Sequence, residues 1–264
     1  MNLFTLISKE ISNKNFFISL ICLLVISIVS LFSLIILAYK LGYNDPEIEL
    51  INYQYKKLKK DNVNIVFIGD SSLGNFIDSS TWENLTKKNT VNLALTGKFQ
   101  YEGNLALIKK ISDKKNVKIN IISSLMNWSI GEKNLYNIIN YYDNIFFRNY
   151  YLVWFNLNRI SVKKIINFYF DIKDDEYNYN YIKNDYIVQG KIIDEKNLDT
   201  SFLTSIVNID KIKSLKNIKK YCDFNNLDCE FFHGPISKKI CDNNKFKEYL
   251  IYLNINLQKN NLLF

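Results

Sequence analysis

The sequence predicts an α/β protein, a three-layer α/β/α sandwich around a parallel sheet, preceded by one transmembrane helix. Two observations carry this prediction. From residue 62 onward, short apolar runs alternate with segments of helical periodicity, as in parallel sheets covered by helices on both faces. Before that point, residues 16–39 contain no charged side chain. The chain of 264 residues has the length of one ordinary domain or two small ones.

Residues 16–39 are expected to form the transmembrane helix, after a short arm over residues 1–15. These 24 residues correspond to about 36 Å of α-helix, enough to cross a hydrocarbon core of about 30 Å. A secretory signal peptide has a shorter apolar core and a small-residue cleavage site, and neither is present. A helix from a globular core usually has a polar face, and this segment has none at any period. The sequence therefore favours a membrane anchor.

The charges that flank this segment leave its orientation open. Lys9 and Lys14 precede it, whereas Lys40 and the lysine-rich run at residues 56–60 follow it. A count of charges favours the second flank as cytoplasmic, but long domains translocate largely regardless of charge. Residues 40–61 are expected to form a basic linker or helix. Its lysines either touch anionic headgroups or form a solvated helix face.

Strands and helices alternate through the rest of the chain. Four apolar strands are expected at residues 63–69, 91–95, 117–124 and 229–235. Four helices are expected at residues 76–88, 101–111, 210–223 and 237–253, the last with Ser237 as its N-cap. Residues 260–264 look like the beginning of a fifth strand.

An aromatic-rich insertion over about residues 136–205 interrupts the alternation. It is densest in aromatic side chains between Tyr136 and Tyr186. One interpretation is helical packing of the insertion on the core. The other is a cap over a functional site, which binds sugar rings or lies at a membrane surface, where Tyr and Trp are favoured. The acidic residues at 171–176 lack calcium-loop spacing and are expected to form a solvated turn.

Composition excludes several classes of function. The net charge is +8, but the lysines are scattered, so no nucleic-acid partner is expected. Four Cys residues are too few for a disulfide scaffold and lack the CxxC spacing of a zinc site. His233 is the single His, which excludes a multi-histidine metal centre and makes it the only candidate for an imidazole base. No cofactor or metal is expected.

The most informative local motif is the segment IVFIGDSSLGNFID at residues 65–78. A buried strand runs into Gly69, which permits a tight turn, and Asp70 and Ser71 then precede a helix. The serine hydroxyl is thereby placed at the carboxyl end of a parallel strand, where open α/β sheets bind ligands. The amide of Ser71 or Ser72 is expected to face the helix N-terminus, where negative charge is stabilised. The alternative is an ordinary strand-to-helix turn with an N-capping Ser.

Here the chain resembles the SGNH hydrolase superfamily, also called GDSL-type esterases, which have a flavodoxin-like fold. The motif Gly69-Asp70-Ser71 matches the first block of that family. Gly97, in LALTGKFQ, stands where the second block supplies an oxyanion-hole amide. Asn127, in SSLMNW, stands where the third block supplies an Asn side chain, although the Gly of its usual GxND is missing. The resemblance covers about residues 62–130 well and residues 205–264 loosely.

The resemblance implies a role for each of these residues. Ser71 is expected to attack an acyl carbonyl as the nucleophile, with a base taking its proton. Gly97, Asn127 and the amides of Ser71 and Ser72 are expected to hold the oxyanion. Asp70 is expected to organise the turn.

The last block of the family, DxxH, is absent from the chain. Glu230 lies three residues before His233, but residues three apart on a strand point to opposite faces, so Glu230 is a poor partner for the imidazole. The chain is expected to end before the usual catalytic pair. Either His233 substitutes as the base, or the chain is truncated or non-catalytic. We expect His233 near the cleft but too far from Ser71 for a direct hydrogen bond.

Membrane-anchored members of this superfamily act on cell-envelope glycans, often with a multi-spanning acyl-donor protein. The resemblance therefore implies a membrane-tethered esterase or O-acyltransferase, with its domain outside the cytoplasmic membrane. Cys222 and Cys229 could then pair; inside the cell they would be buried thiols. The alternative is a non-catalytic, membrane-anchored assembly or glycan-binding protein. Nucleotide binding is disfavoured, because GDSSLGN lacks the Walker lysine and the GxGxxG spacing.

Overall fold

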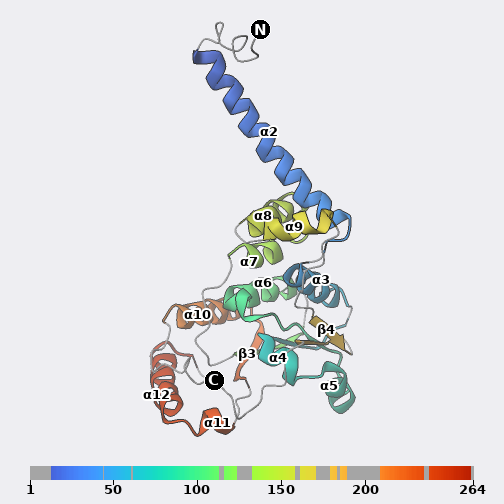
Figure 1. Cartoon of the computed structure of the whole chain (residues 1–264). Helices are drawn as coiled ribbons and strands as arrows, with labels where there is room; N and C mark the ends of the chain where they lie inside the picture. The colour runs from blue at the N-terminus through green and yellow to red at the C-terminus, as the bar shows by residue number, and fades with distance from the viewer. Residues whose placement is uncertain are drawn as a thin grey trace, which may run out of the picture. The chain divides into compact units, whose positions relative to one another are not determined.

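Two compact units make up the chain in the computed structural model, which Figure 1 shows coloured by residue number. The anchor unit comprises Met1–Asn44 and Val153–Asp174, and the sheet unit comprises Asp45–Leu152 and Asp175–Phe264. The structure describes residues 13–43, 45–60, 62–112, 116–123, 133–157, 161–170, 179–182, 185–188, 209–234 and 238–262.

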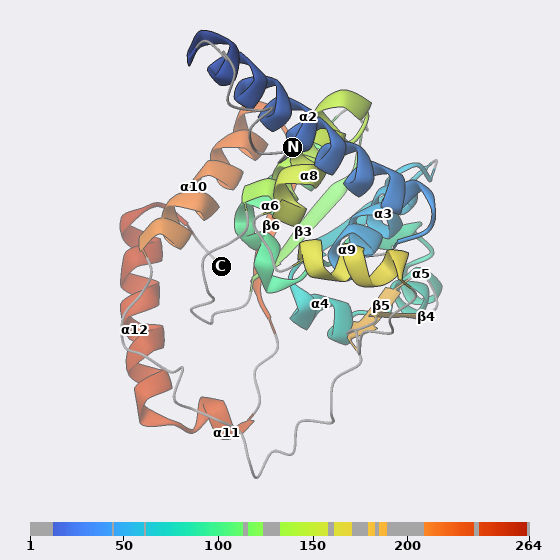
Figure 2. The same cartoon turned by 45° about the horizontal axis from the view of Figure 1, so that its top comes forward.

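A four-stranded parallel sheet lies at the centre of the sheet unit (Figure 2). In chain order its strands are β1 (Ile65–Gly69), β2 (Thr90–Asn92), β3 (Lys118–Ser123) and β6 (Asp228–His233). Every residue of β1 and β2 is buried. This agrees with the apolar sequence of β1, whereas β2 also buries the polar residues Thr90 and Asn92. The α/β class and the parallel sheet are as the sequence predicts.

The strand order β2-β1-β3-β6 creates a topological switch point between β1 and β3. From β1 the chain passes to β2 on one side, and it then crosses back over β1 to reach β3 on the other. Open parallel sheets bind ligands outside the carboxyl ends of their strands at such a point. The residues that follow β1 therefore occupy the favoured position for a site.

Helices of the sheet unit pack along the strands: α4 and α6 contact β1, α5 contacts β2, and α10 contacts β6. Their bounds are α3 (Pro46–Leu58), α4 (Ser71–Phe76), α5 (Ser79–Thr86), η1 (Gly97–Phe99), α6 (Gln100–Ile111), α7 (Lys133–Asn140), α10 (Ile209–Phe224), α11 (Lys238–Cys241) and α12 (Asn244–Lys259). A two-stranded antiparallel sheet, β4 (Tyr179–Ile182) and β5 (Asp185–Val188), belongs to the same unit. Helix α8 (Ile145–Leu157) begins in the sheet unit and ends in the anchor unit.

The C-terminal region differs from the sequence prediction in two places. The helix expected at residues 237–253 is divided into α11 and α12, because the side chain of Asn243 accepts a hydrogen bond from the Lys245 amide at 2.9 Å and starts a new helix. Ser237 lies outside the described residues.

The second difference concerns residues 260–264, where a strand was expected. Asn260 and Asn261 instead form the turn that ends α12, and Asn261 has a left-handed φ of 54°. The Leu262 amide donates to the Leu257 carbonyl at 2.9 Å, the bond of a Schellman motif. Both leucines belong to one buried cluster, so their contact favours the helix ending over an extended chain. Residues 263–264 lie outside the described residues.

Helix α3 occupies the region where a basic linker or helix was expected. Asp45 caps it by accepting a hydrogen bond from the Glu47 amide at 2.9 Å. The helix belongs to the compact sheet unit and buries one side, including Lys57. The Lys57 ammonium donates to the Asn92 carbonyl at 2.6 Å. The interpretation of the lysine run as a solvated face is therefore wrong for Lys57.

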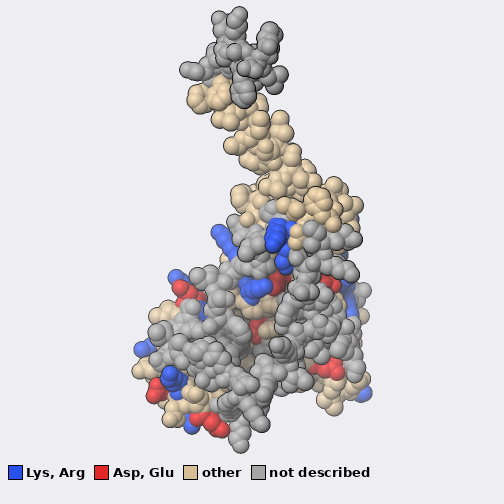
Figure 3. Space-filling model, viewed as in Figure 1, with Lys and Arg blue, Asp and Glu red and all other residues tan. Residues whose placement is uncertain are grey.

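The anchor unit is built on α2 (Asn13–Lys40), with α9 (Ser161–Tyr169) and the end of α8. Helix α2 is long and apolar enough to cross a membrane. Its surface carries no charged side chain between residues 16 and 39 (Figure 3). Helix α9 contacts it near its C-terminal end. Gly42, with a φ of 105°, ends α2 in a turn where the Tyr43 amide donates to the Ala38 carbonyl at 2.9 Å.

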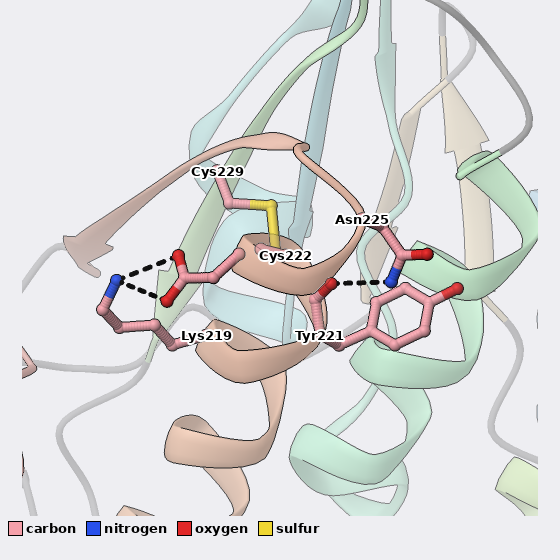
Figure 4. Close-up of a disulfide and its surroundings, with 6 residues drawn as sticks. Lys219, Tyr221, Cys222, Asn225 and Cys229 are labelled. Atoms are coloured by element: carbon pink, nitrogen blue, oxygen red, sulfur yellow. Dashed lines mark hydrogen bonds and ion pairs between the residues drawn. A yellow bond between two sulfur atoms is a disulfide. The ribbon is translucent and has the colours of Figure 1, made fainter.

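A disulfide joins Cys222 of α10 to Cys229 of β6, with Cα atoms 6.2 Å apart (Figure 4). It spans another Schellman turn, in which Asn226 has a φ of 51° and the Leu227 amide donates to the Cys222 carbonyl at 2.9 Å. The turn brings the end of α10 back onto the start of β6. The pairing that the sequence analysis left open is therefore present.

Candidate functional site

Ser71 is the first residue of α4, directly beyond the carboxyl end of β1. The Asp70 carbonyl accepts hydrogen bonds from the Leu73 and Gly74 amides at 3.1 and 3.3 Å, so Asp70 starts the helix, and Ser71 is half-buried. Gly69 is required for close packing, because a Cβ there would collide with the Ile122 carbonyl oxygen of β3. The close approach of β3 to β1, directly before the turn that presents Ser71, therefore requires a glycine at position 69.

Gly97 lies at the same edge of the sheet as Ser71. Beyond β2 the chain continues alongside β1, and the Leu95 amide donates to the Gly69 carbonyl at 2.9 Å. Gly97 is two residues past Leu95, and Ser71 is two residues past Gly69. The backbone pairing thus brings the expected nucleophile and the first expected oxyanion donor to one end of the sheet.

A buried carboxylate holds the segment around Gly97. The Glu47 side chain of α3, only 3% exposed, accepts hydrogen bonds from Thr96 Oγ1 at 3.0 Å and Lys98 Nζ at 2.7 Å. Gln54 Nε2, further along α3, donates to the Ala94 carbonyl at 2.5 Å. Charge-assisted bonds to a buried group are stronger than neutral ones and restrict geometry. Helix α3 therefore fixes the backbone on both sides of Gly97, as a preorganised donor requires.

His233 ends β6, at the same sheet edge but on another strand. The parallel register pairs Ser123 with His233, one step beyond the pair of Gly69 and Ile122. Strand β3 lies between β1 and β6, and two interstrand spacings amount to about 10 Å. Although His233 is exposed to solvent, partial desolvation by the surrounding protein lowers the pKa of its imidazole below the usual value.

Glu230 does not act as a partner for His233 in this arrangement. Its carboxylate accepts a hydrogen bond from Lys118 Nζ of the neighbouring strand β3, at 2.7 Å. Both side chains are exposed, so this pair contributes little to stability. The sequence-based argument that Glu230 is a poor partner for the imidazole agrees with this contact.

Lys211 is a charged residue near the site that the sequence analysis missed. It lies in the first turn of α10, a crossover helix that runs antiparallel to the strands and so begins at their carboxyl edge. Burial lowers its pKa to about 8, although the charges of Asp70 and Glu102 act in the opposite direction. On the next turn Ser214 Oγ donates to Glu102 at 2.6 Å, which ties α10 to α6.

This environment makes Lys211 a candidate base. At pH 7 to 8 an appreciable fraction of an ammonium group with a pKa near 8 is deprotonated and can accept a proton. No sequence motif marks Lys211, because lysines are frequent along the chain. Its burial and its charge interaction with Asp70 distinguish it from the other lysines.

Two further expected site residues are not fully described. Asn127 lies outside the described residues, as does the side chain of Ser72. Part of the insertion is described close to the site, because strand β5 contacts helix α4, which begins at Ser71. Helix α7, where the insertion begins, packs on α6, as the interpretation of helical packing on the core expects.

A hollow of about 670 Å³ lies at the opposite edge of the sheet. Asn64, Lys118 and Asp228, at or next to the starts of β1, β3 and β6, line it. It is therefore separate from the Ser71 edge. Among the residues that the structure describes, no group of three His, Cys, Asp or Glu side chains is arranged to hold a metal ion.

Comparison of the chain with protein-family models, with curated proteins and with solved structures gives no match.

Proposed function

We propose that the chain is a membrane-anchored serine esterase or O-acyltransferase with an SGNH-type three-layer α/β/α fold. In this proposal it adds or removes O-acyl groups on a cell-envelope polysaccharide. The observation that carries the proposal is the juxtaposition of Ser71 and Gly97 at the carboxyl edge of the sheet, beside the topological switch point. The GDS turn and the rigid segment around Gly97 support it.

The chemistry follows the usual two steps of acyl transfer. Ser71 Oγ attacks the acyl carbonyl while a base takes its proton, and the oxyanion accepts hydrogen bonds from the Gly97 amide and Asn127. The ester bond of the donor then breaks and its alcohol leaves with the proton. Water or a sugar hydroxyl next attacks the acyl-serine, which releases Ser71 and completes hydrolysis or transfer.

Lys211 is the base that we propose. It is close enough to Asp70, the neighbour of Ser71, for the two charges to interact, whereas His233 stands two strands away. The low pKa that burial gives Lys211 supplies a neutral amine near physiological pH. His233 is the alternative base, and the two make different predictions for the pH dependence of the rate.

The test is aryl acetate hydrolysis by the full chain in detergent, measured as kcat/KM against pH. Ser71→Ala should abolish turnover. If Lys211 is the base, the rate should rise as the pH increases through about 8, because the neutral amine is the active form. If His233 is the base, the rate should rise at a lower pH than with Lys211, because desolvation lowers the pKa of the imidazole below its usual value.

Matched variants separate the two bases. Lys211→Met should lower kcat/KM by about 10²-fold or more, the usual contribution of a general base. Lys213→Met, an exposed lysine on the same helix, should leave it unchanged. Loss of activity in His233→Asn but not in Lys211→Met would assign the imidazole instead. Equal rates in the wild type and Ser71→Ala would contradict the enzyme proposal.

The second candidate function is a non-catalytic glycan-binding or assembly protein. The absence of DxxH from the sequence and the position of His233 two strands away from β1 favour it. It predicts that an acetylated envelope polysaccharide binds equally well to the wild type and to Ser71→Ala, without turnover. The proposed esterase predicts release of acetate by the wild type alone.

The proposal also places the sheet unit outside the cytoplasmic membrane, next to a multi-spanning acyl-donor partner. The disulfide between Cys222 and Cys229 supports this orientation, because disulfides persist in oxidising compartments. Alkaline phosphatase fused after Phe264 should be active. An inactive fusion, together with a reduced Cys222–Cys229 pair in cells, would reverse the orientation.

A further inference from the structure

The uncovered part of α2 is too short to cross a membrane by itself. Every residue from Asn15 to Ser30 is exposed. Residues 16–30 provide about 22 Å of helix, whereas a hydrocarbon core is about 30 Å thick. The missing length, about 8 Å, corresponds to roughly five more residues. A bilayer that α2 spans therefore extends to about Ile35, where other parts of the chain cover one side of the helix.

The covering segments come from α9 and the end of α8. Ile35, 1% exposed, forms a buried cluster with Ala38, Tyr43, Val153 and Ile165. The opposite side of α2 remains exposed and apolar. From Leu31 onward, α2 therefore has one side against protein and one side open.

Hydrogen bonds fix the level of α9 along α2. Tyr169 Oη, at the end of α9, donates to the Leu34 carbonyl at 2.8 Å. Asn156 Nδ2 of α8 donates to Tyr39 Oη at 3.1 Å. Polar groups without access to water need such internal partners. The end of α9 thus lies at the level of residue 34, where the length argument places the boundary of the hydrocarbon core.

The side of α9 that faces away from α2 is divided into an apolar and a polar half. Ile166 and Phe170, the residue that follows α9, form the apolar half and are exposed, Phe170 by 73%. Tyr169 lies at the edge of this half, because its hydroxyl reaches α2 while 38% of the residue stays exposed. Lys163 and Asn167 belong to the polar half, which a helical projection places beside it. This division is typical of helices that lie in a membrane interface, with an apolar side in the acyl boundary and lysines among the headgroups.

Trp154 extends this surface onto α8. Its ring contacts Phe32 of α2 edge to face, with centroids 6.3 Å apart, yet 39% of the residue is exposed. Trp and Tyr concentrate at membrane–water interfaces, where the ring is apolar and the polar tip reaches water or headgroups. We call Trp154, Ile166, Tyr169 and Phe170 the interface patch.

We propose that the interface patch is a membrane-docking surface, seated in the headgroup and upper acyl region of the bilayer that α2 spans. The inference rests on the anchoring role of α2 within the proposed function. Its occupant is lipid, because Trp154 and Tyr169 contact Phe32 and Leu34 of α2, whose apolar residues Leu34 and Leu37 are themselves exposed. Seated in this way, α9 and the end of α8 hold α2 at a set depth and orientation in the bilayer.

The experiment uses the full chain in vesicles of phosphatidylcholine and phosphatidylglycerol whose acyl chains are brominated near the headgroup. The chain has three Trp residues. One variant retains only Trp154, through Trp82→Phe and Trp128→Phe. The matched control retains only Trp82, which has nearly the same exposure, 38% against 39%, but belongs to the sheet unit. Bromine quenches only tryptophans that reach the lipid.

Trp154 should lose most of its fluorescence in brominated vesicles and be protected from aqueous iodide, whereas Trp82 should show the reverse. A third variant, with Phe170→Trp as the only Trp, should behave like Trp154. Trp154 quenched by iodide and not by bromine would overturn the proposal. Protection of Trp154 from both quenchers, with chemical cross-linking into dimers, would overturn it in favour of a second copy of the chain.

The experiment distinguishes a failure of the membrane anchor α2 from a failure of the interface patch. If α2 does not span the bilayer, the chain leaves the vesicles in alkaline carbonate, and the function proposal loses its anchor. If the chain stays in the vesicles but Trp154 remains accessible to iodide, the anchor stands and the interface patch is wrong.

Discussion

The two units of the chain use the same apolar residue types in opposite ways. In the sheet unit, Val66, Ile68 and Leu93 are almost fully buried, and the exclusion of water from such side chains stabilises the fold. In the anchor unit, residues of the same kind along α2 remain exposed, for example Leu23 and Ile26. Among the described residues, the apolar side chains of the sheet core are covered by their own unit, whereas most of those along α2 are not and favour apolar surroundings.

The largest expected effect is at Gly69 in the sheet unit. In Gly69→Ala the new Cβ meets backbone, the Ile122 carbonyl, which cannot move aside cheaply. We expect the free energy of unfolding to fall by about 3 kcal/mol, the upper range for overpacking. Urea unfolding of the full chain in detergent, followed by near-UV circular dichroism, measures the change.

Gly42→Ala in the anchor unit is the matched control for that change. Gly42 has a positive φ but no atom within 4 Å of an added Cβ. Only the conformational cost of a left-handed alanine, about 1 kcal/mol, is then expected. Equal effects of the two substitutions would contradict the contrast between a close-packed sheet unit and an open anchor unit.

Loss of the disulfide should cause the second-largest decrease in stability, and only the sheet unit should be affected. Cys222 and Cys229 are seven residues apart, and closing a loop of that size stabilises a fold by about 2 kcal/mol. Reduction, or the double change Cys222→Ala with Cys229→Ala, should lower the urea midpoint of the sheet unit. Helix content of α2 in micelles should not change. Free Cys241, replaced by Ala in parallel, serves as the control.

Glu47 should have the smallest effect on stability and a clear effect on activity. Glu47→Gln removes the charge that Lys98 pairs with but keeps an oxygen for Thr96. Because Lys98 is half-exposed and can be solvated, we expect a loss of about 1 kcal/mol. Looser geometry at Gly97 should lower kcat in aryl acetate hydrolysis more than it changes KM. Unaltered kcat would indicate that Gly97 takes no part in the reaction.

The proposed site was only partly accessible to sequence reasoning. Ser71 and Gly97 each follow a strand, and parallel strands end at one edge, so their common location could be expected. Lys211 could not be found in this way, because its distinguishing property is loss of water around one ammonium group among many lysines. The structural role of Glu47 could not be predicted from the sequence either, because its partners Thr96 and Lys98 are about fifty residues away along the chain.

The sequence by itself determined the elements whose signal is local. An uncharged run of 24 residues predicts a helix long and apolar enough to cross a membrane, and the apolar run at residues 63–69 predicts the buried strand β1. Tertiary structure alone decided the strand order, the joining of α3 to the sheet unit and the pairing of α2 with α9. These features depend on contacts between segments that are far apart along the chain. The local sequence pattern of one segment does not show which other segment it packs against. The same reason explains the end of the chain, where the contact of Leu257 with Leu262 favoured a helix ending over the expected strand.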